Sequence, residues 1–98
     1  MQYLIITSDR GSIDWKAKDD VLRKEAHYIW DLTVQGIVRN IWFTQKNKDA
    51  ILIIEAESEQ KTIAIMNNAP LVVEGLLEYK VVGLQAYTGF ERLFHGTD

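Results

Sequence analysis

The segment IVRNIWFTQKNKDAILIIEAE (residues 37–57) decides the fold, because it holds two strand-like runs on either side of a short polar turn. The first run, residues 37–43, and the second, residues 50–57, are rich in β-branched and aromatic residues, which favour strands. The turn between them, TQKNKD (44–49), is short enough to join antiparallel neighbours. This segment therefore predicts a β-hairpin in the middle of the chain.

On each side of the hairpin the sequence predicts one helix and one outer strand. Residues 15–35 contain no Gly or Pro, and their apolar residues recur at helical spacing up to Gly36, a residue suited to a left-handed helix cap. Residues 59–68 predict a second helix that follows Ser58 and stops before Pro70. The remaining apolar runs, residues 2–8 and 76–87, predict the first and last strands.

The element order β-α-β-β-α-β is that of an α+β, ferredoxin-like fold: a four-stranded antiparallel sheet with both helices on one face. The first and third strands are apolar on both faces, but two helices cover only one of them. A large uncovered apolar face normally marks an interface, and a second copy packed sheet to sheet is the simplest way to cover it. We therefore expect a homodimer or a higher homo-oligomer.

The segment AYTGFERLF (86–94) is unusually apolar for the end of a chain, which is polar in most domains. Phe90, Leu93 and Phe94 recur at a spacing of three and four residues, which predicts one helical turn with a single apolar face. We expect residues 1–98 to form a single domain, because the chain is too short for two cores. Residues 88–98 are predicted to be a tail that packs on a partner subunit.

Composition and charge exclude several classes of protein. The net charge is −3 and acidic and basic residues are interspersed, so we expect no nucleic-acid or anionic-membrane partner. No apolar run is long enough to span a bilayer, and no secretion signal opens the sequence. The lack of cysteine excludes disulfides and thiolate metal sites and favours a cytoplasmic location.

The sequence contains no motif for a bound cofactor or metal ion. It has no Gly-rich phosphate loop, no Ser or Cys nucleophile motif and no acidic cluster with cation-binding spacing. His27 and His95 have no metal-ligand spacing, and His27 lies on the polar side of the first predicted helix with Trp30. An aromatic residue on that side is best explained by contact with a neighbouring subunit. We expect neither a metal nor a cofactor.

Glu25 is the strongest candidate for a catalytic residue. It lies near the centre of the helix stripe that should face the sheet, within about 60° of Val21, Leu22, Tyr28, Ile29 and Leu32. A buried, ionised carboxylate needs a partner or a cavity, and an apolar pocket raises its pKa toward values that suit proton transfer. The alternative is that Glu25 is a structural acid that binds an Arg or a Tyr.

Arg39 is the second candidate for a catalytic residue. Strand alternation places it on one face with Ile37, Ile41 and Phe43, and its guanidinium could bind a substrate carboxylate through two hydrogen bonds. We expect Arg39 to share a pocket with Glu25 between helix and sheet. Two alternatives stay open, since Arg39 could simply neutralise Glu25 or pair across the oligomer interface.

Four further residues are candidates for substrate binding. Asn40 and Trp42 face away from Arg39 and would line either the cleft between subunits or a pocket. Tyr28 and Tyr87 are possible hydrogen-bond donors to a substrate carbonyl, although tyrosines are mostly amphipathic packing residues.

The stretch GIVRNIW (36–42) and the segment APL (69–71) resemble the muconolactone delta-isomerase-like proteins, and the similarity extends over roughly residues 20–87. That family belongs to the dimeric α/β-barrel superfamily of ferredoxin-like folds. The resemblance implies a sheet-to-sheet dimer with a pocket that shuttles a proton on a small unsaturated lactone. Glu25 and Arg39 match a Glu and an Arg of the family. In contrast, Asn40 stands where the family typically has His, and the chain ends in a different tail.

These observations favour a small cofactor-free isomerase that acts by proton transfer on a small carbonyl or lactone compound. In this hypothesis Glu25 moves the proton and Arg39 binds the anionic or enolate oxygen. One alternative is a non-catalytic ligand-binding or assembly module with the same barrel. Another is a cofactor-free monooxygenase or cyclase of the same superfamily.

Overall fold

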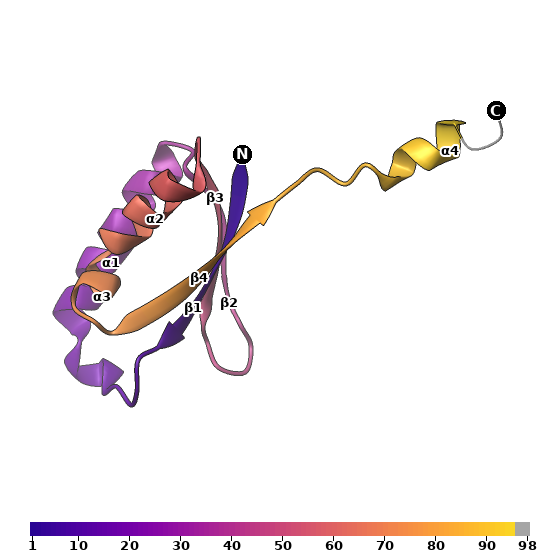
Figure 1. The fold of residues 1–98 in the computed structure, drawn as a ribbon. Helices are drawn as coiled ribbons and strands as arrows, with labels where there is room; N and C mark the ends of the chain where they lie inside the picture. Colours follow the sequence, from indigo (N-terminus) through magenta and orange to yellow (C-terminus); the bar gives the residue numbers. More distant parts are fainter. Residues whose placement is uncertain (96–98) are drawn as a thin grey trace.

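A four-stranded antiparallel sheet carries helices α1, α2 and α3 on one of its faces (Figure 1). The computed structural model describes residues 1–95. The strands lie in the order β2-β3-β1-β4, and their bounds are β1 Gln2–Asp9, β2 Val38–Phe43, β3 Ala50–Glu55 and β4 Leu77–Leu84. This arrangement confirms the predicted ferredoxin-like α+β fold, including the central β2–β3 hairpin.

The first predicted helix, residues 15–35, consists of two helices in the structure. A 3₁₀ turn, η1 (Trp15–Ala17), precedes the long helix α1 (Asp19–Val34), and the backbone of Lys18 between them is not helical. Gly36 follows the end of α1 with a φ of +79°, a conformation that glycine adopts without steric cost. The predicted left-handed cap at Gly36 is therefore confirmed.

Two shorter helices connect β3 to β4 on the same side of the sheet. Helix α2 (Glu59–Asn67) begins after Ser58, whose hydroxyl oxygen accepts a hydrogen bond from the backbone N–H of Lys61 at 3.1 Å, as expected of an N-cap. Helix α3 (Pro70–Val73) begins with proline, which needs no hydrogen bond to its nitrogen at that position. Helix α3 packs against α1.

The core lies between the helices and the covered face of the sheet. Ile5 of β1 and Ile54 of β3 are completely buried, and Leu32 of α1 and Met66 of α2 pack in the same cluster. Along β1, the side chains of Tyr3, Ile5 and Thr7 are buried on this face, whereas those between them point to the other face.

Strand β2 contains a bulge at Arg39, which changes the predicted alternation. Val38 pairs with Ile54 and Asn40 pairs with the next residue of β3, Ile53, so Arg39 is an extra residue without a partner on β3. Val38 therefore lies on the helix-covered face together with Ile41 and Phe43. The prediction that Arg39 shares a face with Ile41 and Phe43 is wrong, because the bulge interrupts the two-residue period between them.

No helix among residues 1–95 covers the other face of the sheet, which is largely apolar. We call this surface the open sheet face. Its exposed apolar side chains come from strands β1, β2 and β4: Ile6, Trp42, Val82 and Leu84. Leu4, Ile51 and Ile53 lie half-buried between them. The predicted uncovered apolar face is present, and the second copy expected to cover it stays a prediction.

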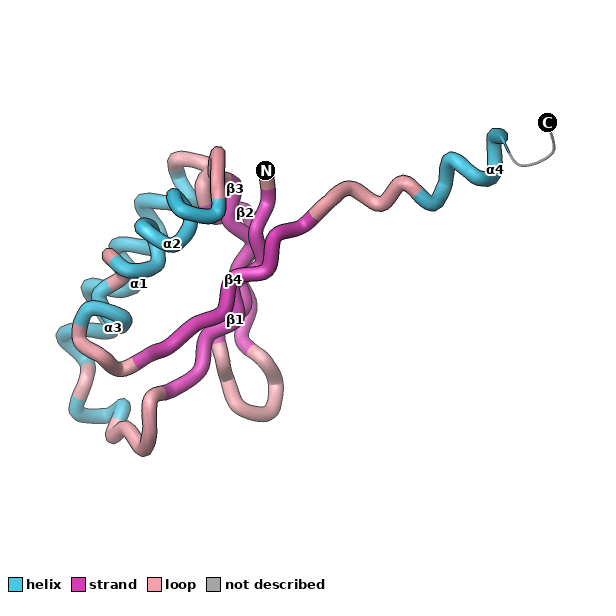
Figure 2. The backbone as a smooth tube through the Cα atoms, in the orientation of Figure 1, coloured by secondary structure: helices cyan, strands magenta, loops and turns pink. Residues whose placement is uncertain are grey.

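The C-terminal segment runs away from the domain after β4 (Figures 1 and 2). Strand β4 ends at Leu84, so Tyr87 lies beyond the strand that was predicted to include it. The segment forms a 3₁₀ turn, η2 (Gly89–Glu91), and a short helix, α4 (Arg92–His95), in the region predicted to be helical. The rings of Tyr87 and Phe90 meet edge to face, with centroids 4.9 Å apart. Residues 96–98 of the predicted tail lie outside the described residues.

The extended tail gives the chain an elongated shape. Its principal dimensions are 63 × 29 × 21 Å and its radius of gyration is 16.6 Å, compared with about 13 Å for a compact chain of this length. Phe90, Leu93 and Phe94 are each at least 64% exposed. No helix among the described residues is long and apolar enough to cross a membrane.

Candidate functional site

A cleft of about 820 Å³ lies between α1 and the covered face of the sheet. Side chains from all four strands, α2 and α3 contribute to its walls, and η1 and the β2–β3 loop border it. Most of these side chains are apolar, and Trp15, Trp30 and Phe43 are aromatic. A largely apolar cleft with a few polar groups is the usual form of a small-molecule site.

Helix α1 contributes one stripe of side chains to the cleft. Leu22, Ala26, Ile29 and Thr33 follow one another at intervals of three or four residues, which places them on the same side of a helix. Glu25 lies within this stripe and its side chain lines the cleft. The predicted position of Glu25, on the sheet-facing side of the helix, is confirmed.

The Glu25 carboxylate is held by one hydrogen bond within residues 1–95. Its Oε1 accepts from the backbone N–H of Leu71 at 3.0 Å. Removal from water raises the pKa of Glu25, and the hydrogen bond from Leu71 opposes this effect only in part. A half-buried carboxyl with a raised pKa retains its proton at higher pH than an exposed one, so it can serve as an acid or a base closer to neutral pH.

Tyr28 lies one turn after Glu25 on α1 but does not line the cleft. Its hydroxyl donates a hydrogen bond of 2.6 Å to the carbonyl oxygen of Ile65 at the end of α2. Burial raises the pKa of Tyr28, and the nearby negative charge of Glu25 raises it further. The hydroxyl proposed from sequence as a substrate donor is thus engaged in joining α1 to α2.

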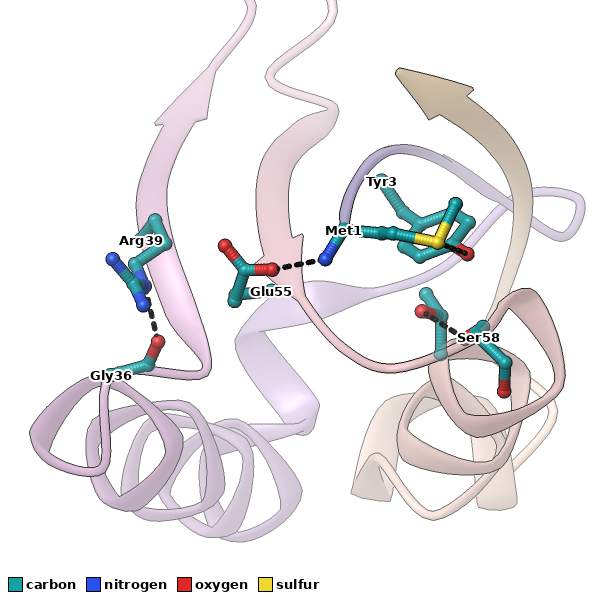
Figure 3. Close-up of polar contacts among 7 residues, drawn as sticks. Met1, Tyr3, Gly36, Arg39, Glu55 and Ser58 are labelled. Carbon is teal, nitrogen blue, oxygen red and sulfur yellow. Dashed lines mark hydrogen bonds and ion pairs between the residues drawn. The ribbon is translucent and has the colours of Figure 1, made fainter. Parts of the chain in front are cut away.

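Arg39 is not among the residues that line the cleft. It lies near Gly36, which follows the end of α1 (Figure 3). Its Nε donates a hydrogen bond to the carbonyl oxygen of Gly36, and its side chain is exposed. The positive charge of Arg39 acts on Glu55, whose carboxylate also pairs with the amino group of Met1 at 2.5 Å. The hydrogen bond from Met1 and the positive charges of Met1 and Arg39 lower the pKa of Glu55.

The structure therefore does not bring Arg39 and Glu25 together within one chain. The expectation of a shared pocket depended on strand alternation through residue 39, and the bulge removes that alternation. Asn40 and Trp42 lie on the open sheet face, and Tyr87 lies in the tail beside Phe90. Of the six residues predicted for the site, Glu25 is the one that lines the cleft.

Comparison with known proteins gives similarity in structure but not in sequence. No protein-family model matches the chain, and no curated protein matches its sequence. Among solved structures, the 5-chloro-2-hydroxyhydroquinone dehydrochlorinase TftG from Burkholderia phenoliruptrix AC1100, in complex with 2,5-dihydroxybenzoquinone, is 20% identical. It superposes with a TM-score of 0.73, over 91% of this chain and 98% of that one. A muconolactone isomerase is 16% identical with a TM-score of 0.75, over 90% and 92% of the two chains.

The chain shares the fold of these two proteins, a four-stranded antiparallel sheet with helices on one face. At identities of 16–20%, the likeness establishes the fold alone. The resemblance inferred from GIVRNIW and APL is thereby confirmed for the architecture. The roles of individual residues have to be argued from this chain's own geometry.

Several residues that line the cleft were not assigned to a site from the sequence. The indole Nε1 of Trp15 donates a hydrogen bond of 3.0 Å to the carboxylate of Asp9, which holds the ring at the cleft. Lys48 borders the cleft from the β2–β3 loop. Trp30, which the sequence suggested as a contact for a neighbouring subunit, lines the cleft although 64% of the residue is exposed. Phe43 could have been identified as a cleft residue from the sequence, because strand alternation places it on the same face as Ile41, which also lines the cleft.

The described part of the chain contains no group of three or more His, Asp or Glu side chains that could hold a metal ion. His27 is exposed on α1, in agreement with its predicted position. The side chain of His95 lies outside the part that the structure describes.

Proposed function

We propose that this protein is a cofactor-free enzyme that transfers a proton on a small carbonyl or lactone compound, with Glu25 as its acid–base group. The observation that carries the proposal is the Glu25 carboxyl itself, which lines a largely apolar cleft with a raised pKa. Perturbed carboxyls in clefts are typical of catalytic sites, because general acid–base catalysis requires a pKa near the working pH.

The hydrogen bond from Leu71 supports a defined orientation of the carboxyl. It engages Oε1, so Oε2 is the atom that would take a proton from one carbon and return it to another. The apolar and aromatic side chains around Glu25 would separate the reacting carbon from bulk water. Electrostatic interactions within the cleft would be stronger as a result.

The names of the two structural neighbours support the substrate class. TftG is a dehydrochlorinase of a chlorinated hydroxyhydroquinone and was solved with 2,5-dihydroxybenzoquinone, and the other neighbour is a muconolactone isomerase. Both names refer to small oxygenated ring compounds. We propose a substrate of this class for the present chain, in a cleft of about 820 Å³ that exceeds the size of a single ring. Arg39 is not part of this proposal, because its guanidinium lies outside the cleft.

We also propose that the protein works as a homo-oligomer in which two open sheet faces meet and the tail packs on a partner subunit. The exposed apolar side chains of that face and of the tail support this assembly, because both would be removed from water. The cytoplasmic location inferred from the lack of cysteine stays a prediction.

A second candidate function follows from the same hydrogen bond. Glu25 receives the N–H of Leu71 near the start of α3, so it could serve only to fix α3 against α1 in a non-catalytic ligand-binding module. The Glu25→Gln variant separates the two functions, because a glutamine can still accept the Leu71 hydrogen bond but cannot transfer a proton.

The direct test is deuterium exchange. Muconolactone and related unsaturated lactones would be incubated with the protein in D₂O, and deuterium incorporation at carbon would be followed by NMR. We expect Glu25→Gln to slow exchange by roughly 10²–10⁴-fold while the melting temperature holds or rises. Asp31→Asn, a change to an exposed acid on the same helix, is the control and should exchange normally. Unchanged exchange in Glu25→Gln would favour the ligand-binding module.

A further inference from the structure

Lys48 is the only cationic residue among the described residues that line the cleft. The acids that line it are Glu25 and Asp9, and the Asp9 carboxylate already accepts the hydrogen bond of Trp15. Lys48 forms no ion pair with any residue in the range 1–95. The ammonium group of Lys48 at the border of the cleft is therefore not neutralised by an ion pair within these residues.

The backbone of Lys48 adopts a conformation that lysine rarely takes. Its φ is +56°, and it is the one non-glycine residue with positive φ in the described part of the chain. The left-handed region is favoured by Gly, Asn and Asp, and Asn47 stands immediately before it in the same loop. The loop therefore carries lysine at the position where asparagine would be less strained.

Hydrogen bonds hold the loop in this conformation. The N–H of Lys48 donates to the carbonyl oxygen of Thr44 at 3.0 Å, and the N–H of Asp49 donates to the hydroxyl oxygen of Thr44 at 3.0 Å. The N–H of Thr44 donates to the carbonyl oxygen of Asp49 at 2.8 Å, which closes the hairpin. A strained residue that its surroundings hold in place is a common feature of ligand-binding positions.

We propose that Lys48 determines specificity by binding an anionic oxygen of the substrate, either a carboxylate or an ionised ring hydroxyl, at the border of the cleft. This inference rests on the proposed function of the cleft and adds to it that the substrate is an anion. Lysine suits this role because its ammonium is a compact charge on a flexible stem, which reaches into a cleft from a loop. Lys48 would thus perform the anion-binding role that the sequence suggested for Arg39.

The competing explanation is that Lys48 is an ordinary solvated lysine of a surface loop. Lys46 provides the comparison, because it belongs to the same loop, is exposed and does not line the cleft. A general effect of positive charge on the loop would be the same for both lysines. An effect of the cleft would be specific to Lys48.

The test compares an anionic with a neutral ring compound in binding measured by isothermal titration calorimetry. 2,5-Dihydroxybenzoquinone ionises at its hydroxyls, and 2,5-dimethoxybenzoquinone has nearly the same ring but no ionisable group. We expect the wild-type protein to prefer the anion. Lys48→Asn should weaken binding of the anion by about tenfold, as for loss of a charge-assisted hydrogen bond, and leave binding of the neutral compound unchanged.

Two further variants complete the experiment. Lys48→Arg should retain most of the preference for the anion, and Lys46→Asn should bind both compounds as the wild type does. Asparagine tolerates positive φ, so Lys48→Asn should melt no lower than the wild type, and lost binding cannot then be attributed to unfolding. Equal affinity of Lys48→Asn and wild type for the anion would overturn the inference, as would an equal loss in Lys46→Asn or a wild type that binds neither compound.

Binding does not require turnover, so this experiment is independent of the proposed reaction. If Glu25→Gln exchanges deuterium normally but Lys48→Asn loses the preference for the anion, the catalytic proposal fails and the binding role of Lys48 stands. If Glu25→Gln loses exchange and Lys48→Asn binds the anion normally, the opposite conclusion follows.

Discussion

The carboxylate of Glu25 and the backbone N–H of Leu71 are 3.0 Å apart, and this hydrogen bond joins α1 to α3 at the cleft. The bond favours the ionised carboxylate, whereas burial favours the protonated acid, and burial has the larger effect on the pKa. Glu25 is therefore both a structural contact and a carboxyl that is ionised at some cost.

The stability of the protein should depend on pH through Glu25. The pKa is raised above its ordinary value of 4.5 in the folded state, so the folded chain binds more protons in this range than the unfolded chain does. The contribution of Glu25 to stability is then fully present below that ordinary value and is lost as the pH rises through the folded pKa. Glu25→Gln keeps an acceptor for Leu71 without a charge, so its stability relative to wild type should rise from pH 4 to pH 7.

Urea unfolding of both proteins at pH 4, 5.5 and 7 measures this difference. Asp31→Asn serves as the control, because Asp31 is exposed. The difference in unfolding free energy between this variant and the wild type should change little with pH. If the difference in unfolding free energy between Glu25→Gln and the wild type is the same at all three pH values, the prediction is contradicted.

Thr7→Val should destabilise the fold next to the cleft. The Thr7 hydroxyl donates to the carbonyl oxygen of Ala50 at 3.1 Å and accepts from its N–H at 2.9 Å, and the residue is only 3% exposed. Valine has the same shape but leaves both backbone groups of Ala50 unpaired, which should cost about 1–3 kcal/mol of unfolding free energy. Ser8→Ala on the open sheet face is the control. Its hydroxyl makes one exposed bond of 3.4 Å, so a loss as large as that of Thr7→Val would count against this explanation.

A charge on the open sheet face should disrupt assembly. Ile6 on this face and Ile63 on α2 are both 37% exposed, so they form a matched pair. Ile6→Lys should lower the oligomer mass in light scattering, because a subunit interface would have to bury its ammonium. Ile63→Lys should leave the mass unchanged. Equal masses for the two variants would exclude the open sheet face as the main interface.

Removal of residues 88–98 should weaken the oligomer while the far-UV circular dichroism of the domain is retained. The tail runs away from its own domain, so its exposed apolar side chains have no other described surface to cover (Figure 1). Serine at Phe90, Leu93 and Phe94 should have the same effect on the mass as the deletion. An oligomer mass that does not respond to either change would refute the packing of the tail on a partner.

The fold was predictable because each element has its own periodic signal. The stripe of α1, the Ser58 cap and the hairpin around residues 44–49 are local features, and local features determine element type and order. The same angular argument placed Glu25 correctly, since the rotation per residue of a helix does not depend on the rest of the protein. Helix α1 begins later than predicted, because nothing in the sequence distinguishes the turn at Trp15 from the helix that follows.

The rest of the site was not predictable for physical reasons. A bulge adds a residue to a strand without a distinctive composition, so the position of Arg39 could not be read from alternation. Trp15 and Lys48 reach the cleft from a single 3₁₀ turn and from a loop, whose paths depend on tertiary hydrogen bonds rather than on a long periodic pattern. Asp9 and Trp15 are six residues apart, and no regular element would bring them together.

The bulge in β2 also affects how this chain can be compared with others. Val38 and Asn40 pair with consecutive residues of β3, so a strand that lacked residue 39 would keep every other side chain on its present face. Arg39 is thus equivalent to an insertion of one residue. If a strand without such a bulge is matched to this one by motif spacing alone, its residues beyond the bulge are aligned with residues of β2 that lie on the opposite face. An alignment of β2 with a strand that has no such bulge would therefore need a gap at position 39, which sequence spacing alone does not reveal.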